Sequence, residues 1–155
     1  MAIIQKEPFV IEDIINNLRH EYSSIGAVVS FVGYVREFSN INNKAKLEAL
    51  HIEHYPAMTQ NELLKIEDIA KKKWDIEATQ IIHRVGELKV NEIIVGVIVL
   101  SKHRDEAFDA CRFIIDYLKT EAPFWKKEIT SKGSYWVEKN EQDNLKTKKW
   151  QEIIK

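Results

Sequence analysis

Hydrophobic residues recur along this chain at two spacings, and the spacing separates helices from strands. The first helical pattern has apolar side chains every three or four positions: Ile11, Ile14, Ile15, Leu18 and Tyr22. This pattern predicts an amphipathic helix, and Gly26 is expected to end it. Residues 27–36 follow and are rich in β-branched and aromatic side chains, which predicts a strand with a bulge at Gly33.

Three further runs predict strands in the middle of the chain. Residues 47–55 are expected to pair with the strand at 27–36, because a short polar stretch separates the two. Residues 78–85 and 93–100 are expected to form two more strands connected at Gly86. Because the run at 93–100 is apolar almost throughout, we expect it to be a central strand covered on both faces.

Helical patterns occupy much of the remaining sequence. Thr59 and Glu62 have the spacing of a capping box, so a helix is expected to start there and to bury Leu63, Ile66, Ala70 and Trp74. Ser101 is expected to cap a second helix that runs to about Lys119, with four side chains inward: Phe108, Cys111, Ile115 and Leu118.

The C-terminal part of the chain predicts a hairpin and a last helix. Residues 125–130 and 135–137 are expected to pair around a turn at 131–134, and a charged helix is expected from Glu141. Four apolar positions of that helix are free to pack on another element: Leu145, Trp150, Ile153 and Ile154. Since helices and strands alternate without a strict βαβ repeat, the predicted fold class is α+β.

Composition narrows the possible functions. The chain has 155 residues and a formal net charge of -1, which favours one domain over residues 1–155 and gives no overall basic field for nucleic acid. Cys111 is the only cysteine, so an intrachain disulfide is impossible and a reducing, cytoplasmic setting is expected. The N-terminus lacks a signal-peptide pattern, and no apolar run approaches the roughly 20 residues that span a bilayer.

The most informative stretch lies around Pro123. Lys119 ends a helical pattern, Pro123 breaks it, and Lys126 follows on a predicted strand, so a sharp change of direction separates two amines. His103 and Arg104 lie at the start of the same helix, where cations oppose the helix dipole and a bound phosphate would resolve the conflict. These residues together predict a local cationic pocket for an anionic small molecule.

Each of these residues also has a structural explanation. A cation at the helix end, such as Lys119, is favoured by the dipole alone. His103 and Arg104 could be an exposed pair whose charge is offset by the next two residues, Asp105 and Glu106. Strand alternation places Lys126 and Glu128 on one face, as a surface ion pair or a proton-transfer pair, and places Trp125 on the core face. Arg36 ends a strand, two residues after Tyr34 on the same face, and a strand-terminal arginine is usually solvated.

The histidines and the cysteine give little support for metal or thiol chemistry. His51 and His54 are three apart on a predicted strand and therefore point to opposite faces. No metal site is predicted. Cys111 lies on the inward face of its helix, where a cysteine behaves as a small core residue.

In order and spacing, these segments resemble the large, catalytic subunit of molybdopterin synthase over nearly the whole chain, from about Pro8 to Trp150. The matching segments are 26–36 (GAVVSFVGYVR), 53–58 (EHYPAM), 83–87 (HRVGE), 101–104 (SKHR), 116–128 (DYLKTEAPFWKKE) and 136–138 (WVE). The segment around Lys119 and Lys126 is the most specific of these. Ala57 departs from the pattern, because glycine is expected after the preceding Tyr-Pro.

The resemblance implies a sulfurtransferase that converts cyclic pyranopterin monophosphate to molybdopterin, with no cofactor of its own. Sulfur would come from the C-terminal Gly-Gly thiocarboxylate of a small ubiquitin-like partner, in a heterotetramer built on a homodimer of this chain. The implied fold is α+β with an α/β-hammerhead arrangement. Lys119 and Lys126 would be catalytic, and the implied substrate site also includes Tyr34, Val35, Arg36, His103, Arg104, Lys127 and Glu128.

Two other functions remain open on the residues alone. One is a non-catalytic RNA- or nucleotide-binding module that uses the same basic residues, with Phe124 and Trp125 stacking on bases. The near-neutral charge and the expected inward position of Trp125 argue against it. The other is a scaffold whose helices only dock a partner.

Overall fold

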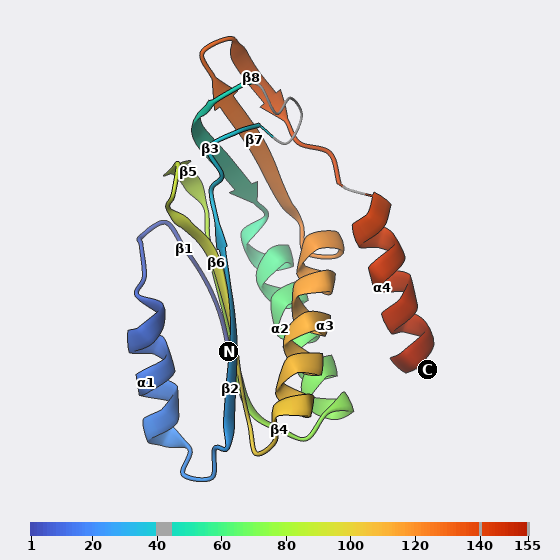
Figure 1. Ribbon diagram of the computed structural model, residues 1–155. Helices are drawn as coiled ribbons and strands as arrows, with labels where there is room; N and C mark the ends of the chain where they lie inside the picture. The colour runs from blue at the N-terminus through green and yellow to red at the C-terminus, as the bar shows by residue number, and fades with distance from the viewer. Residues whose placement is uncertain (40–44, 140, 155) are drawn as a thin grey trace.

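The computed structural model describes residues 1–39, 45–139 and 141–154 and contains four helices and eight strands in that part of the chain (Figure 1). The helices are α1 (Ile11–Glu21), α2 (Pro56–Lys73), α3 (Arg104–Thr120) and α4 (Glu141–Ile154). The strands are β1 (Ala2–Gln5), β2 (Ala27–Tyr34), β3 (Leu47–His54), β4 (Ile76–Arg84), β5 (Gly86–Lys89), β6 (Ile93–Ser101), β7 (Phe124–Thr130) and β8 (Gly133–Trp136). The α+β class is confirmed.

The first sheet is the centre of the molecule and has the strand order β1-β4-β6-β2. β1 runs parallel to β4, and the other two pairings are antiparallel. Helices α2 and α3 cover one face and α1 covers the other (Figure 1). β6 is therefore central and buried on both faces, as its continuous apolar run predicts, and the ladder slips between Gly33 and Tyr34, which confirms the expected bulge.

The second sheet has the order β5-β3-β7-β8 and extends beyond the first at one end (Figure 1). The expectation that residues 47–55 pair with the strand at 27–36 is wrong. A single bridge joins Phe38 to Lys46, and β3 then pairs with β5 and β7 instead. The predicted hairpin of β7 and β8 is confirmed, with Thr130 opposite Gly133 at its turn.

Two predicted helix starts are corrected by the structure. α2 begins at Pro56, so Thr59 is not a cap: it lies inside the first turn, is buried, and donates its hydroxyl hydrogen to the carbonyl of Pro123 at 3.0 Å. α3 begins at Arg104 with His103 as its N-cap residue. Ser101 ends β6 and uses its hydroxyl to join the carbonyl of Asp75 to the backbone N–H of His103.

The buried face of α3 includes Cys111 as predicted but differs from the prediction at Phe108. Phe108 is 60% exposed, whereas the fully buried positions are Ala107, Ala110, Cys111, Phe113 and Ile114. Small side chains at 107 and 110 let the helix approach the sheet closely, and Phe113 fills the space that remains. Ile115 and Leu118 are partly buried at the edge of this core.

Two short strands were not predicted from the sequence. β1 and β5 have four residues each, too few for a periodic signal. Gly26 does not end α1, which stops at Glu21. A Cβ on Gly26 would lie 2.1 Å from the carbonyl oxygen of Lys102, so glycine is required by the close approach of two backbones.

The last helix packs beside α3, as predicted in outline. Trp150 and Ile154 pack against the main core, and the Trp150 indole donates to a carboxylate oxygen of Asp116 at 2.7 Å. Leu145 and Ile153 are more than half exposed. No helix within the described residues is long and apolar enough to cross a membrane.

Candidate active site

A cavity of about 700 Å³ lies where the end of α3, the start of β7 and the segment before α4 meet the first sheet. Lys119 and Lys126 both line it, so the structure brings together the two amines that the sequence singled out. The remaining lining residues are Phe31, His83, Val95, Ile115, Leu118, Ala122, Phe124, Trp136, Val137, Glu138, Lys139 and Asp143. The cavity lining thus combines apolar and aromatic side chains with several charged ones.

The turn between α3 and β7 sets the two lysines on adjoining walls. α3 ends at Thr120, Ala122 is buried, and Pro123 is held by the hydroxyl of Thr59. β7 then begins at Phe124, so Lys126 enters the cavity from a strand while Lys119 enters it from a helix end. Lys119 is exposed, and Lys126 is half-buried.

The electrostatics of the two amines differ. Burial lowers the pKa of Lys126, and the positive charge of Lys119 lowers it further, while Asp143 opposes the shift. A lysine whose ammonium form is disfavoured gives up a proton more readily than an exposed lysine. Lys126 is therefore the stronger candidate for proton transfer.

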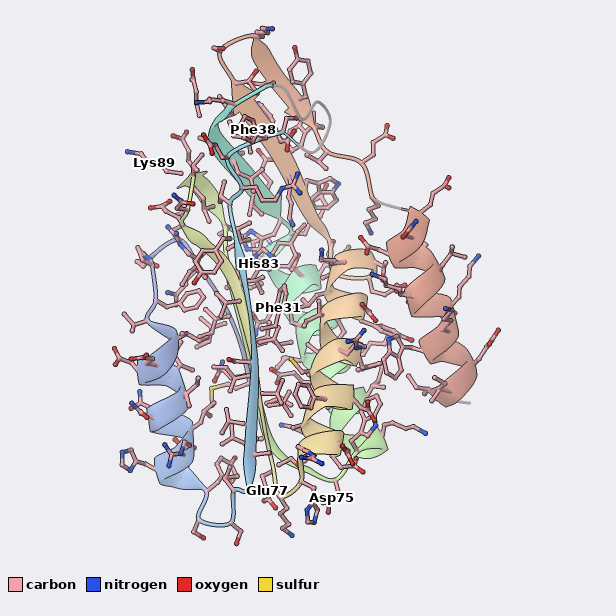
Figure 2. All side chains as sticks on the ribbon, viewed as in Figure 1. Phe31, Phe38, Asp75, Glu77, His83 and Lys89 are labelled. Carbon is pink, nitrogen blue, oxygen red and sulfur yellow. The ribbon has the colours of Figure 1, made fainter. Side chains whose placement is uncertain are left out.

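His83 is a cavity residue that sequence reasoning did not select. It lies on β4, is labelled in Figure 2 and is 5% exposed. Its ring stacks on Phe124 with centroids 3.7 Å apart and planes 13° from parallel. Its Nδ1 lies 2.8 Å from the carbonyl oxygen of Arg84. Its position inside the matching segment 83–87 was the only available signal, because no spacing rule links β4 to β7.

The face assignment of β7 is the reverse of the prediction. Trp125 is 42% exposed, whereas Glu128 is fully buried and accepts a hydrogen bond from the hydroxyl of Ser39 at 2.5 Å. Lys126 and Glu128 do share the inward face, but Glu128 does not line the cavity. Lys127 lies on the outer face, with its ammonium 5.4 Å from the centre of the Trp136 ring.

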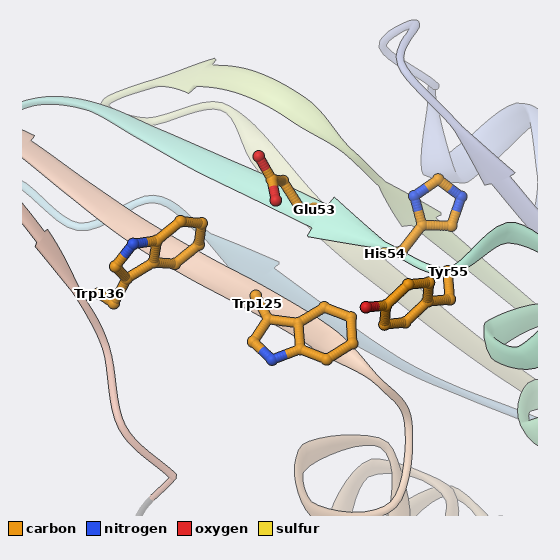
Figure 3. A pocket seen from close by; sticks show the side chains of 5 residues that line it. All are labelled: Glu53, His54, Tyr55, Trp125 and Trp136. Carbon is orange, nitrogen blue, oxygen red and sulfur yellow. The ribbon is translucent and has the colours of Figure 1, made fainter.

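A second hollow of about 390 Å³ occupies the outer face of the second sheet (Figure 3). It is lined by Glu53, His54, Tyr55, Trp125 and Trp136. The rings of Tyr55 and Trp125 meet edge to face at 4.9 Å. Among the described residues, those that line this hollow include aromatic rings and a carboxylate but no lysine or arginine, so the larger cavity suits an anionic ligand better.

The other predicted site residues lie away from the cavity lining. His103 and Arg104 are exposed at the opposite end of α3 from Lys119, about 22 Å away at 1.5 Å per helical residue. Tyr34 and Arg36 are exposed at and just beyond the end of β2, and Val35 is a core residue that is 2% exposed. One chain therefore does not bring all these residues to one small molecule.

Neither metal nor thiol chemistry is supported by the described residues. Among them, no three histidine, cysteine, aspartate or glutamate side chains are placed to hold an ion. Cys111 is buried, and burial raises the pKa of its thiol to about 11, so the reactive thiolate is scarce at neutral pH.

Known proteins resemble this chain over most of its length. The model of the MoaE protein family matches residues 4–121, which is more than half of the chain. The chain belongs to the MoaE family. The "Molybdopterin synthase catalytic subunit" of Pseudomonas aeruginosa is 45% identical, over 98% of this chain and 100% of its own length. The protein of that name from Vibrio cholerae is 43% identical over 96% of each chain.

Solved MoaE structures have the same fold. The "Molybdopterin biosynthesis MoaE protein" from Burkholderia ambifaria superposes with a TM-score of 0.81 at 40% sequence identity, over 97% of both chains. This coverage extends beyond residues 4–121, the segment matched by the family model.

Proposed function

We propose that this MoaE-family chain is the catalytic subunit of a molybdopterin synthase, a sulfurtransferase that converts cyclic pyranopterin monophosphate to molybdopterin. Its relatives bear this name, and the cavity supports it, because two amines converge on a partly apolar space in a chain of net charge -1. A phosphate ester requires such local positive charge, and a pterin ring requires apolar walls.

The sulfur is supplied by a second protein in this proposal. Cys111, the only cysteine, is buried with a raised pKa and does not line the cavity. We propose that the C-terminal thiocarboxylate of a small ubiquitin-like subunit enters the cavity beside Lys119. The exposed amine of Lys119 suits an incoming anionic tail, and the half-buried amine of Lys126 suits proton transfer to or from the substrate.

A dimer would reconcile the remaining predicted residues with this cavity. Arg104 lies about 22 Å along α3 from Lys119, farther than one small molecule reaches. We therefore propose that Arg36, His103 and Arg104 complete the site of a neighbouring copy, with Arg36 the first candidate. Mixed dimers of an Arg36→Ala chain and a Lys119→Ala chain would then recover about one working site in each dimer, and no recovery would count against sharing.

The decisive experiment combines the purified chain, a thiocarboxylated small subunit and the pyranopterin substrate, with dithiolene product as the readout. The chain alone should be inactive, and the mixture should turn over. Lys119→Ala should nearly abolish product without changing the fold, because the side chain is exposed and contributes no core packing. Lys132→Ala is the matched control, since Lys132 is an exposed lysine in the turn between β7 and β8.

Lys119→Arg separates positive charge from proton transfer. A guanidinium keeps the charge but does not give up a proton at neutral pH. Near-normal activity with arginine would assign Lys119 a purely electrostatic role and leave proton transfer to Lys126. Steady turnover by the isolated chain, with no partner present, would overturn the proposed source of sulfur.

The structure bears in two opposite ways on the alternative function, a nucleic-acid-binding module. Trp125 faces outward, so its expected burial no longer argues against base stacking. Phe124, however, already stacks on His83, and the outer hollow presents Glu53 to any backbone phosphate. We also propose a cytoplasmic location for the synthase, because a lone reduced cysteine fits that compartment.

A further inference from the structure

His83 occupies a restrained position in the wall of the larger cavity. Its imidazole is 5% exposed and lies flat against Phe124 at a centroid distance of 3.7 Å. Phe124 follows the Pro123 break and lines the same cavity. The stacked ring of Phe124 and the 2.8 Å hydrogen bond between Nδ1 and the Arg84 carbonyl leave the imidazole little freedom to rotate.

The hydrogen bond to the backbone fixes the tautomer of this ring. The carbonyl oxygen of Arg84 can only accept, so the proton of the neutral imidazole resides on Nδ1, 2.8 Å away. Nε2 then carries an unshared lone pair. Within the described ranges 1–39, 45–139 and 141–154, no group donates a hydrogen bond to Nε2. Among the described residues, the fully buried side-chain atoms without a partner are Glu67 Oε1 and Thr79 Oγ1, so Nε2 of His83 keeps some access to the cavity that His83 lines. A ligand in that cavity can therefore donate a hydrogen bond to it.

Burial and, secondarily, the neighbouring charges keep the ring neutral. Burial is the main cause that lowers the pKa of His83, to about 3, and the positive charges of Lys126 and then His54 add to it, against the bond to the Arg84 carbonyl. Lys119, Glu138, Lys139 and Asp143 also line this cavity. A ring that stays neutral at pH 7 is a hydrogen-bond acceptor and a poor carrier of protons.

We infer that His83 is a specificity-determining residue whose Nε2 accepts a hydrogen bond from a ring N–H of the bound heterocycle. The inference rests on the proposed function, in which a pterin occupies this cavity. Phe31, Ile115 and Leu118 offer no polar atom to an amide-type N–H of the pterin. The other acceptors in the lining, Glu138 and Asp143, are carboxylates, and their negative charge is unfavourable beside a phosphate ester. His83 supplies an acceptor that adds no charge beside the phosphate.

Equilibrium binding of a pterin phosphate ester to the purified chain tests this role. His83→Phe retains a ring to stack on Phe124 but has no acceptor, and it should bind the pterin about tenfold more weakly. His83→Gln places an amide oxygen near the position of Nε2 and should restore most of the affinity. His54→Phe is the matched control, because His54 lies nearer the outer hollow and does not line the cavity. It should leave affinity unchanged.

A ligand-side change probes the same contact in the unmodified protein, where misfolding is not a concern. A pterin phosphate methylated at the amide nitrogen of its pyrimidinone ring should bind the wild-type chain about tenfold more weakly than the parent. The His83→Phe chain should bind both ligands equally. Equal binding of the two ligands by the wild-type chain would overturn the inference, as would equal affinity of wild-type and His83→Phe for the parent.

The outcomes distinguish this inference from the function on which it rests. No binding of the pterin by the wild-type chain, together with no product in the presence of the thiocarboxylated subunit, would refute the proposed function itself. Tight binding and normal turnover with no dependence on His83 would refute only the role of His83. Circular dichroism of each variant confirms that it is folded before its dissociation constant is compared.

Discussion

His83 should make the stability of this protein fall as the pH is lowered from neutral. The imidazole is buried against Phe124 and its pKa in the folded state is lowered from 6.5 to about 3, chiefly by burial and then by the charge of Lys126. Between these two values the unfolded chain binds a proton that the folded chain does not. Acid therefore favours unfolding in this window, and the effect is absent above the unfolded pKa.

The size of the effect follows from the two pKa values. A pH of about 5 lies roughly 1.5 units below the pKa of this histidine in the unfolded chain. At about 1.4 kcal/mol per unit, protonation of the unfolded chain then lowers the stability by about 2 kcal/mol. At about pH 7.5 the same ring is neutral in both states and costs almost nothing. His83→Gln removes the titrating group. The difference in unfolding free energy between wild type and variant should therefore shift by about 2 kcal/mol between the two pH values.

Urea denaturation of both proteins at the two pH values measures this shift. Using the difference between proteins cancels other groups that titrate in the same range, such as the buried Glu67, whose pKa is raised chiefly by burial. His20→Gln is the control, because His20 is exposed on α1. An unchanged difference at both pH values would mean that the folded chain accepts a proton at His83 as easily as the unfolded chain, which would contradict the buried, neutral ring.

Three other changes test the packing and the proposed site. Trp150→Phe keeps the ring contacts but removes the 2.7 Å bond to Asp116, and urea denaturation should show a loss of about 1.5–3 kcal/mol. Gly26→Ala would place a Cβ 2.1 Å from the Lys102 carbonyl oxygen, and its melting temperature should drop by several degrees, as for a loss of about 2 kcal/mol. Arg104→Ala should weaken pterin phosphate binding about tenfold by titration calorimetry at an unchanged melting temperature, since Arg104 is exposed.

The long elements could be predicted from local pattern because the burial of each one is written in its own hydrophobic spacing. The apolar stripe of α1, the continuous run of β6 and the hairpin of β7 and β8 are all visible without a partner. The pairing of β3 was not visible, since the same alternation fits any sheet that accepts it. After the single bridge between Phe38 and Lys46, β3 joins the second sheet instead of pairing with β2. Which sheet a strand joins is decided by the packing of the core.

The faces of β7 show the same limit at the scale of single residues. A tryptophan is usually more buried than a lysine, so the pattern placed Trp125 inward and Lys126 outward. The structure reverses them, because the inward face of this strand borders a cavity and carries Lys126 and the buried Glu128. Local preference was overruled where the strand meets the candidate site.

By itself the sequence determined the fold class, the family resemblance and the two amines on either side of Pro123, because these depend on residues close together along the chain. Tertiary structure alone decided that His83 joins these amines in one cavity and that His103 and Arg104 lie at the far end of α3. The physical reason is that a cavity is formed by elements distant in sequence. Its burial and charge, which set the pKa values of Lys126 and His83, exist only after the sheets and helices have packed.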